Sequence, residues 1–437
     1  MFDIQSRREF IRRAILAGTA TAAMPLATSA AGDETPSGSS SPNEKLNIAV
    51  VGCANRGYAD LKGVSSESIV ALCDIDESHL AKAASEFPAA RKYVDYRRMI
   101  DDGGFDALVV GTPDHSHAIP VVRGLEAGLD IYCEKPLAHS VWEVRQMREW
   151  AARKKAVTQM GTQIHAGNNY RRVVELVKAG TIGPIQRVHV WHGGTVRPGK
   201  RVAKGTPPKG VDYDLWIGPA PMRPFDLSHF HFNWRYWWDF GGGTLGDFGC
   251  HYMDLPFWAL DLRYPTRVAA TGEKAHEGDN EVPGNMKVDY QFPARGDQPP
   301  VHLTWYHGAW HPEGAEQYGK GSAVLFEGAH GRLLADYGTH KLYQSDDDKP
   351  MDVKAIDPIP NSIGHHAEWI AACKSRGPTT CNFDYSGALA EAVLLGNVSY
   401  RADQKPLEWD AVNLVATNCP EAEPLVRREY RKGWSLE

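Results

Sequence analysis

Asp247 and His251 are the residues of this sequence whose types and spacing most directly indicate chemistry. They stand four residues apart, just after a glycine run that begins at Gly241. If a helix begins at that run, both side chains project from one face near its N-terminus and can meet one ligand. Oxidation of an alcohol requires a base that takes the hydroxyl proton as hydride leaves the same carbon, and histidine titrates close enough to neutrality to serve. The alternatives are a helix-capping carboxylate at Asp247 and a core histidine at His251.

Lys135 is the third candidate, in the segment Glu134-Lys135-Pro136 that follows an apolar run. A lysine there would bind the same alcohol oxygen and stabilise its developing negative charge. Asp247 would then orient the imidazole of His251 or hold a neighbouring hydroxyl. A surface cation is the alternative for Lys135. These three residues form the predicted catalytic group.

The elements that must position Lys135 are predicted by alternating strand and helix signals after position 45. Four short apolar runs suit a parallel sheet that is buried on both faces: Leu46 to Val51, Ile69 to Cys73, Ala107 to Val110 and Leu129 to Cys133. In such sheets, ligands bind at the carboxyl ends of the strands. We therefore expect an N-terminal Rossmann domain, a doubly wound α/β sheet, whose turns carry the binding residues.

The turn after the first of these runs is a variant of the dinucleotide-binding fingerprint G-x-G-x-x-G, and it reads Gly52-Cys53-Ala54-Asn55-Arg56-Gly57. Ala54 replaces the second glycine, and its methyl group is small enough for a nucleotide still to fit. Asp74 ends the next strand about 20 residues on, where a carboxylate accepts both ribose hydroxyls and repels a 2′-phosphate. We therefore expect NAD, with NADP less favoured. The alternatives are an ordinary glycine turn and a capping or solvated Asp74.

Three segments together carry a family resemblance: Gly111-Thr112-Pro113-Asp114-His115-Ser116-His117, Glu134-Lys135-Pro136 and the stretch from Gly241 to Asp254. With them the chain resembles the glucose-fructose oxidoreductase, inositol dehydrogenase and MocA (Gfo/Idh/MocA) family. The resemblance implies Lys135 as the catalytic lysine, Asp247 as the substrate-binding acid and His251 as the general base. The residues expected to bind the cofactor are Gly52, Ala54, Asn55, Arg56, Gly57, Asp74, Thr112, Pro113, His115, His117, Glu134 and Lys135.

The second half of the chain predicts a different architecture. Alternating segments from Ile185 to Gln291 and from Val301 to Phe326 indicate half-buried antiparallel strands. We infer a C-terminal α+β domain with a large open, mainly antiparallel sheet. The ring-dense segment 229–238 suits sugar faces and hydroxyls, although a core loop or an oligomer interface is an equal interpretation. The candidate substrate-binding residues are Gln163, His165, His231, Trp234, Arg235 and Trp238. A helix that opens at His365 and His366 is expected to reach back toward the site.

The N-terminus has the features of a twin-arginine export signal. Arg7 and Arg8 precede an apolar stretch from Ala14 to Leu26 and small residues suited to cleavage. A plain amphipathic helix is the alternative. We expect a signal over 1–31, a flexible linker over 32–44, an NAD-binding domain over 45–165 and a substrate-binding and oligomerisation domain over 166–437. Export through the twin-arginine machinery would place the protein in the periplasm or otherwise outside the cytoplasm.

Composition argues against several other classes of protein. The net charge of −6 with interspersed signs does not suggest a nucleic-acid surface, and no later apolar run reaches membrane-spanning length. The seven cysteines form no CxxC pair, so buried free thiols are expected. The 18 histidines include close pairs but no zinc-type spacing, and we predict no metal.

The predicted location constrains the reaction. Free nicotinamide cofactor is scarce outside the cytoplasm, so an exported dehydrogenase needs a tightly held one. We expect an exported NAD(P)-dependent oxidoreductase that acts on a CH–OH group of a sugar, glycoside or polyol. One alternative is a redox-neutral, NAD-dependent glycoside hydrolase or lyase that acts through a transient keto-sugar, and a second is a non-catalytic sugar-binding module. The resemblance also suggests a dimer or tetramer that uses the open sheet face.

Overall fold

The computed structural model describes four stretches of the chain: 45–194, 205–275, 282–344 and 358–436. The predicted signal and linker lie outside the described residues. Within the described stretches, no helix is long and apolar enough to cross a membrane.

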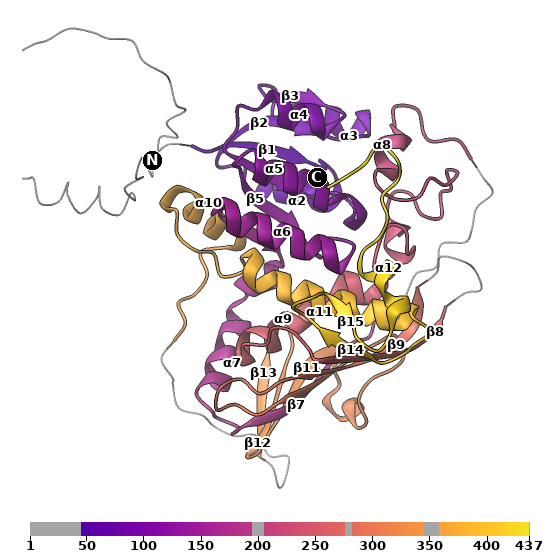
Figure 1. The fold of residues 1–437 in the computed structure, drawn as a ribbon. Coiled ribbons are helices and arrows are strands. Elements are labelled where there is room, and N and C mark those ends of the chain that lie inside the picture. The colour runs from indigo at the N-terminus through magenta and orange to yellow at the C-terminus, as the bar shows by residue number, and fades with distance from the viewer. Residues whose placement is uncertain (1–44, 195–204, 276–281, 345–357, 437) are drawn as a thin grey trace, which may run out of the picture. The chain divides into compact units, whose positions relative to one another are not determined.

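Six parallel strands form the N-terminal sheet, in the order β3-β2-β1-β4-β5-β6 (Figure 1). They are β1 (Asn47–Val51), β2 (Ser68–Cys73), β3 (Arg91–Tyr93), β4 (Ala107–Val110), β5 (Asp130–Glu134) and β6 (Thr158–Gly161). The accompanying helices are α2 (Asn55–Gly63), α3 (Glu77–Glu86), α4 (Tyr96–Asp102), α5 (Ala118–Glu126) and α6 (Val141–Lys154). The strand order reverses between β1 and β4, which opens a ligand crevice at their carboxyl ends. The predicted doubly wound sheet is confirmed.

The C-terminal sheet has nine strands in the order β13-β12-β11-β7-β10-β9-β8-β14-β15. They are β7 (Ile185–His192), β8 (Arg267–Lys274), β9 (Pro283–Phe292), β10 (Val301–His307), β11 (Ser322–Gly328), β12 (Gly331–Ala335), β13 (His340–Gln344), β14 (Leu407–Asp410) and β15 (Val415–Ala416). Neighbouring strands are antiparallel except β7 and β10, which pair in parallel. The predicted large, mainly antiparallel sheet is therefore also confirmed.

Two long helices, α9 (Gly243–Leu260) and α11 (Phe383–Arg401), connect the two sheets. Helix α11 packs against α6 on one side and against α9 and β8 on the other. It is apolar nearly all round, as expected of a helix buried on every side. Where α11 meets α6, Arg145 donates two hydrogen bonds of 2.8 Å to the buried carboxylate of Glu391. This paired geometry compensates both charges for their loss of water.

Segments late in the chain return to the N-terminal domain. Helix α10 (His365–Ser375) packs on α2, where His366 Nε2 lies 3.0 Å from Asp60 Oδ1. Helix α10 thus reaches back toward the site, as expected, although its first residues do not line the cavity described below. Near the C-terminus, Arg428 donates to Glu143 Oε1 at 2.7 Å, so the tail braces α6. The remaining helices are α7 (Asn168–Lys178), α8 (Tyr213–Ile217) and α12 (Glu423–Val426). The short 3-10 turns are η1 (Asp114–Ser116), η2 (Gln163–Ala166), η3 (Asn233–Tyr236), η4 (Ala315–Tyr318) and η5 (Pro420–Ala422).

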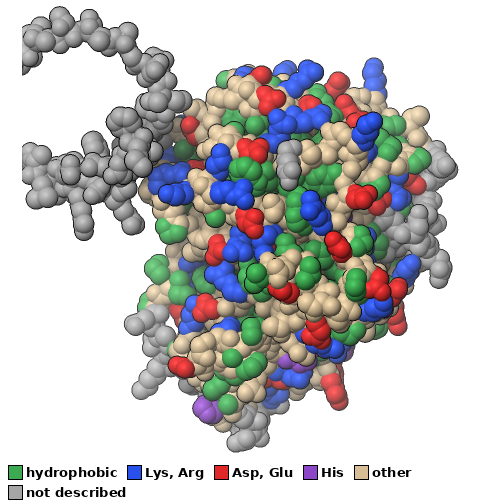
Figure 2. All heavy atoms as spheres, viewed as in Figure 1, with side chains coloured by type: hydrophobic (Ala, Val, Ile, Leu, Met, Phe, Trp, Pro, Cys, Tyr) green, Lys and Arg blue, Asp and Glu red, His purple; other side chains and the backbone are tan. Residues whose placement is uncertain are grey.

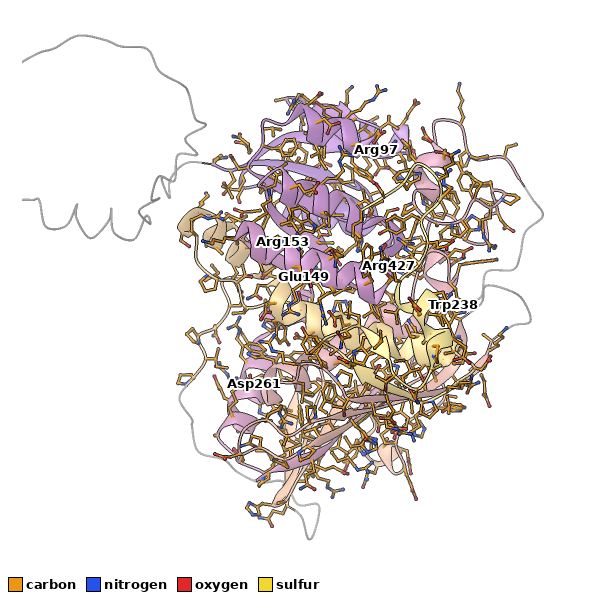
Figure 3. All side chains as sticks on the ribbon, in the orientation of Figure 1. Arg97, Glu149, Arg153, Trp238, Asp261 and Arg427 are labelled. Carbon is orange, nitrogen blue, oxygen red and sulfur yellow. The ribbon has the colours of Figure 1, made fainter. Side chains whose placement is uncertain are left out.

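The distribution of charged side chains and the state of the cysteines match what the composition of the chain predicts. On the face that Figure 2 shows, acidic and basic side chains are intermixed. All seven cysteines are buried and free, as expected. Figure 3 shows how densely side chains fill the space around α9 and α11.

Candidate active site

A cavity of about 550 Å³ lies at the carboxyl ends of β1, β2, β4 and β5. Turns of the N-terminal domain form one wall, and residues of α9 and of the segment before it form the other. Of the predicted site residues, those that line it are Gly52, Ala54, Asn55, Arg56, Asp74, Thr112, Pro113, Glu134, Lys135, Gln163, His231, Trp234, Arg235, Asp247 and His251. The fold thus places candidates from both halves of the chain around one space.

The turn between β1 and α2 depends on glycines that allow close backbone approach. Gly52 has a φ of +85°, and a Cβ there would lie 2.7 Å from the carbonyl oxygen of Gly111. A Cβ on Gly57 would lie 2.1 Å from the carbonyl oxygen of Gly52. Gly57 therefore does not line the cavity but lets α2 pack against the turn. Gly111, which we did not assign a role, is the third member of this contact.

Helix α2 offers an anion site at its start. Its N-cap residue, Ala54, has no side-chain acceptor for the first amide N–H groups of the helix. Such groups are left for a ligand to satisfy, and the helix dipole favours a negative one. The alanine at the second fingerprint position is thus compatible with a pyrophosphate.

Asp74 lies at the end of β2, as predicted, and its carboxylate is held in place by the backbone. Cys53 N donates to Oδ2 at 2.8 Å and Asp76 N donates to Oδ1 at 3.0 Å. This fixed, buried acceptor suits ribose hydroxyls and disfavours a 2′-phosphate. These contacts, the turn and the helix start fit NAD.

Arg56, Glu134 and Gln163 form a polar network in the lining of the cavity. Arg56 Nε lies 3.3 Å from Glu134 Oε1, and Gln163 Nε2 donates to the same oxygen at 2.6 Å. Burial, and then the nearby Asp60, raises the pKa of Glu134 well above its usual range. Gln163 therefore reaches the cavity from the 3-10 turn η2 (Gln163–Ala166) that follows β6.

Lys135 and Asp247 form an ion pair across the cavity. Lys135 Nζ lies 2.5 Å from Asp247 Oδ1 and donates to the backbone oxygen of the same residue at 2.6 Å. Arg235 Nε lies 3.4 Å from the other carboxylate oxygen. Burial acts to raise the pKa of Asp247, but Lys135 and Arg235 outweigh it and lower that pKa to about 2. Asp247 is thus a permanent anion that positions the lysine.

His251 lies one helical turn after Asp247 on α9, as the spacing predicts. Its Nδ1 atom is buried without a hydrogen-bond partner among the described residues. Burial, and then the charge of Lys135, lowers the pKa of His251 to about 3. The imidazole is therefore neutral, and its Nδ1 atom is open to a ligand.

Besides Gly57, four predicted residues lie outside the cavity and make other contacts. His115 Nε2 lies 2.8 Å from the oxygen of Trp216, and the two nitrogens of His117 lie 2.8 and 2.9 Å from the oxygens of Thr112 and Pro136. Both histidines brace loops instead of lining the cofactor site. His165 is buried against Asp254 at 2.9 Å and stacks on Trp258. Trp238, labelled in Figure 3, packs on Tyr400 and Arg401 of α11.

The segment 205–240, here called the cover segment, closes the Asp74 end of the cavity. Its apolar side chains pack together with Ile75 of the loop after β2. Asp212 N donates to the oxygen of Ile75, and Glu77 N donates to the oxygen of Gly210, both at 2.9 Å. His231 Nε2 lies 3.2 Å from Asp76 Oδ2. No short motif pointed to Leu215 and Trp216, which also line the cavity.

Comparison with known proteins supports this fold and cofactor. Family models described as "Oxidoreductase family, NAD-binding Rossmann fold" and "Oxidoreductase family, C-terminal alpha/beta domain" match residues 46–162 and 177–436. Inositol 2-dehydrogenase 2 of Saccharopolyspora erythraea is 28% identical over 181 residues, which are 39% of this chain and 53% of the relative. The match spans about half the length of that relative.

Two solved structures share the fold at low identity. The WlbA dehydrogenase of Chromobacterium violaceum, in complex with NADH and UDP-GlcNAcA, has a TM-score of 0.62 at 18% identity and covers 84% of this chain and 97% of its own. Levoglucosan dehydrogenase, in complex with NADH and levoglucosan, has a TM-score of 0.59 at 17% identity and covers 83% and 99%. The two structures agree in fold, and the family model over residues 46–162 confirms the NAD-binding character of the N-terminal domain.

Proposed function

The chain belongs to the Gfo/Idh/MocA oxidoreductase family, and on that premise we propose that it oxidises a CH–OH group of a sugar, glycoside or polyol with a tightly held NAD. The observation that carries the proposal is the group formed by Lys135 from the N-terminal domain and by Asp247 and His251 of α9, in the cavity that Asp74 and the β1–α2 turn also line. The relatives and solved structures named above act on or bind inositol and sugars, which supports this substrate class.

The roles follow from charge and position. Bound NAD, held by Asp74 and the start of α2, would accept the hydride. Lys135 binds the alcohol oxygen and stabilises the charge that develops on it. His251, neutral and without a partner on Nδ1, takes the hydroxyl proton. Asp247 holds Lys135 in place and is itself contacted by Arg235, and both Asp247 and Arg235 can contact neighbouring hydroxyls.

The cover segment supports tight retention of the cofactor. It lies over the end of the cavity where Asp74 would hold the adenosine ribose, and it is fastened to the loop after β2 by His231 and by backbone hydrogen bonds. Release of NAD from such a site requires these contacts to open, which lowers the dissociation rate.

Purified protein is therefore expected to carry about one NAD per chain, released only on denaturation and identified by mass spectrometry. His231→Ala should speed NAD dissociation about fivefold, since one hydrogen bond contributes roughly 1 kcal/mol. His302→Ala, which removes the comparable 2.8 Å pair with Asp289 on the sheet, is the control. If neither the bound nucleotide nor binding of added NAD is found, the proposed oxidation fails.

Export is the second part of the proposal, and the sequence around Arg7 and Arg8 supports it. Replacement of both arginines by lysine is expected to retain the chain in the cytoplasm, because twin-arginine signals are read by a receptor and not by charge alone. Cell fractionation with immunodetection measures this. Equal export of the double variant would contradict it.

Assembly into a dimer or tetramer through the open sheet face stays a prediction, which light scattering of the purified protein tests.

Redox-neutral cleavage of a glycoside uses the same Lys135 and His251. It differs from oxidation in needing a further proton-transfer group.

A further inference from the structure

Asp114 is a buried carboxyl group that the proposed oxidation does not use. It opens the 3-10 turn η1 (Asp114–Ser116) after β4, is only 6% exposed, and lines the same cavity as Lys135 and His251. No hydrogen bond from another residue of the described stretches reaches its carboxylate. Buried polar groups normally have partners, so a carboxyl of this kind that faces a cavity indicates a ligand. Asp114 belongs to the segment from Gly111 to His117 that carries the family resemblance, but its spacing in the sequence does not distinguish it from its neighbours.

The charges around Asp114 differ from those around Asp247. Burial raises the pKa of Asp114 to about 7, while Lys135 and Arg235 act to lower it and Asp247 acts to raise it. The charge of Asp114 in turn acts to raise the pKa of the buried thiols of Cys133 and Cys250. The pKa values of two carboxyl groups in one cavity thus differ widely. In such a pair, one group remains an anion and the other can take up and release a proton. Asp247 is bound to two cations, whereas Asp114 is free to act on a substrate.

We propose that Asp114 removes and returns a proton at the carbon next to a substrate carbonyl bound by Lys135, which gives this protein an enolising activity on keto-sugars. The inference rests on the proposed function, since it takes Lys135 as the residue that binds the substrate oxygen. In the forward step the C–H bond breaks and its proton passes to the Asp114 carboxylate. The electron pair forms a C=C bond, and the carbonyl electrons move to the oxygen, where Lys135 donates a hydrogen bond. The reverse step restores the ketone, so no oxidant or reductant is consumed.

This activity bears on which reaction the protein performs. Oxidation of an alcohol ends at the ketone and needs no second base. If the carbon beside the enolate carries a glycosidic oxygen, the enolate can expel that oxygen, which is the step that redox-neutral glycoside cleavage adds. Among the predicted ring-dense residues, His231 is held against Asp76, with Nε2 3.2 Å from Oδ2, and does not supply this base. Asp114 does.

The test is proton exchange on a ketone supplied directly. The full-length protein is incubated in D₂O with a methyl 3-ketoglucoside, and loss of the signals of the hydrogens next to the ketone is followed by proton NMR. Wild type is expected to accelerate exchange, increasingly as pH rises through about 7, because the ionised form of Asp114 is the base. Asp114→Asn should lower the enzymatic rate about a hundredfold. Asp101→Asn, a 62% exposed carboxylate outside the cavity, is the matched control.

Titration with NAD reports whether Asp114→Asn keeps its fold and cofactor site. Loss of exchange with NAD binding intact supports the inference. Exchange that is unchanged in Asp114→Asn, or absent in wild type, overturns it. If wild type reduces NAD with sugars but Asp114→Asn exchanges normally, the enolising role fails and the proposed oxidation stands. If NAD does not bind at all, the proposed oxidation fails, and the exchange measurement still decides the role of Asp114.

Discussion

Replacement of Lys135 by methionine is expected to lower kcat for sugar oxidation by about a thousandfold while NAD remains bound. The reason is that Nζ, which lies 2.5 Å from the carboxylate that positions it, is the group proposed to bind the alcohol oxygen as it gains charge. Burial acts to lower the pKa of Lys135, but Asp247 outweighs it and keeps that pKa above its usual value, so the ammonium is present at every working pH. Methionine retains most of the volume and removes only the charge and its hydrogen bonds.

Steady-state rates with a panel of sugars and polyols, together with NAD titration, measure this effect. Lys62→Met is the control, because Lys62 pairs with Glu86 at 3.1 Å on the exposed side of α2. Asp247 keeps Arg235 as a neighbouring cation in the Lys135 variant, which limits the penalty of an unpaired buried carboxylate. An unchanged kcat, or a loss explained wholly by weaker NAD binding, would remove Lys135 from the chemistry.

The parts of the site that local sequence determines were predictable. The turn from Gly52 to Gly57 follows a short apolar strand, and its glycines are required because the backbones approach too closely for a Cβ. Asp247 and His251 share a helix face because helical spacing places residues four apart on one side. In both cases a pattern within a few residues determines the geometry.

Contacts between distant segments were not predictable in this way. His165 comes two residues after Gln163, which lines the cavity. It is nevertheless buried against Asp254, which is 89 residues away in the sequence. Trp238 faces α11 because the chain turns between it and Trp234, and no periodic pattern specifies that turn. The closure of the cavity by the cover segment likewise depends on tertiary packing on Ile75. The domain boundaries remain a prediction. Segments from late in the chain, α10 and the C-terminal tail, pack on the N-terminal domain, and no local pattern in the sequence indicates such contacts.

His251→Gln is expected to lower kcat about a thousandfold, because an amide cannot take up the hydroxyl proton. Glutamine retains a polar side chain of similar reach, so binding of NAD and sugar should persist. The loss should therefore appear in kcat more than in KM. A small effect would mean that solvent or another group accepts the proton.

The pH dependence provides a separate check on the same residue. An exposed histidine loses its basic form as pH falls through about 6.5. Burial and then Lys135 lower the pKa of His251 to about 3, so the neutral form persists through the whole range from about pH 4 to about pH 8. For oxidation, kcat/KM should accordingly show no acid limb near pH 6.5, whereas proton exchange by Asp114 should still rise through about pH 7. Two profiles that differ in this way would show that oxidation and enolisation use different bases in one cavity, and a shared profile would assign both steps to a single group.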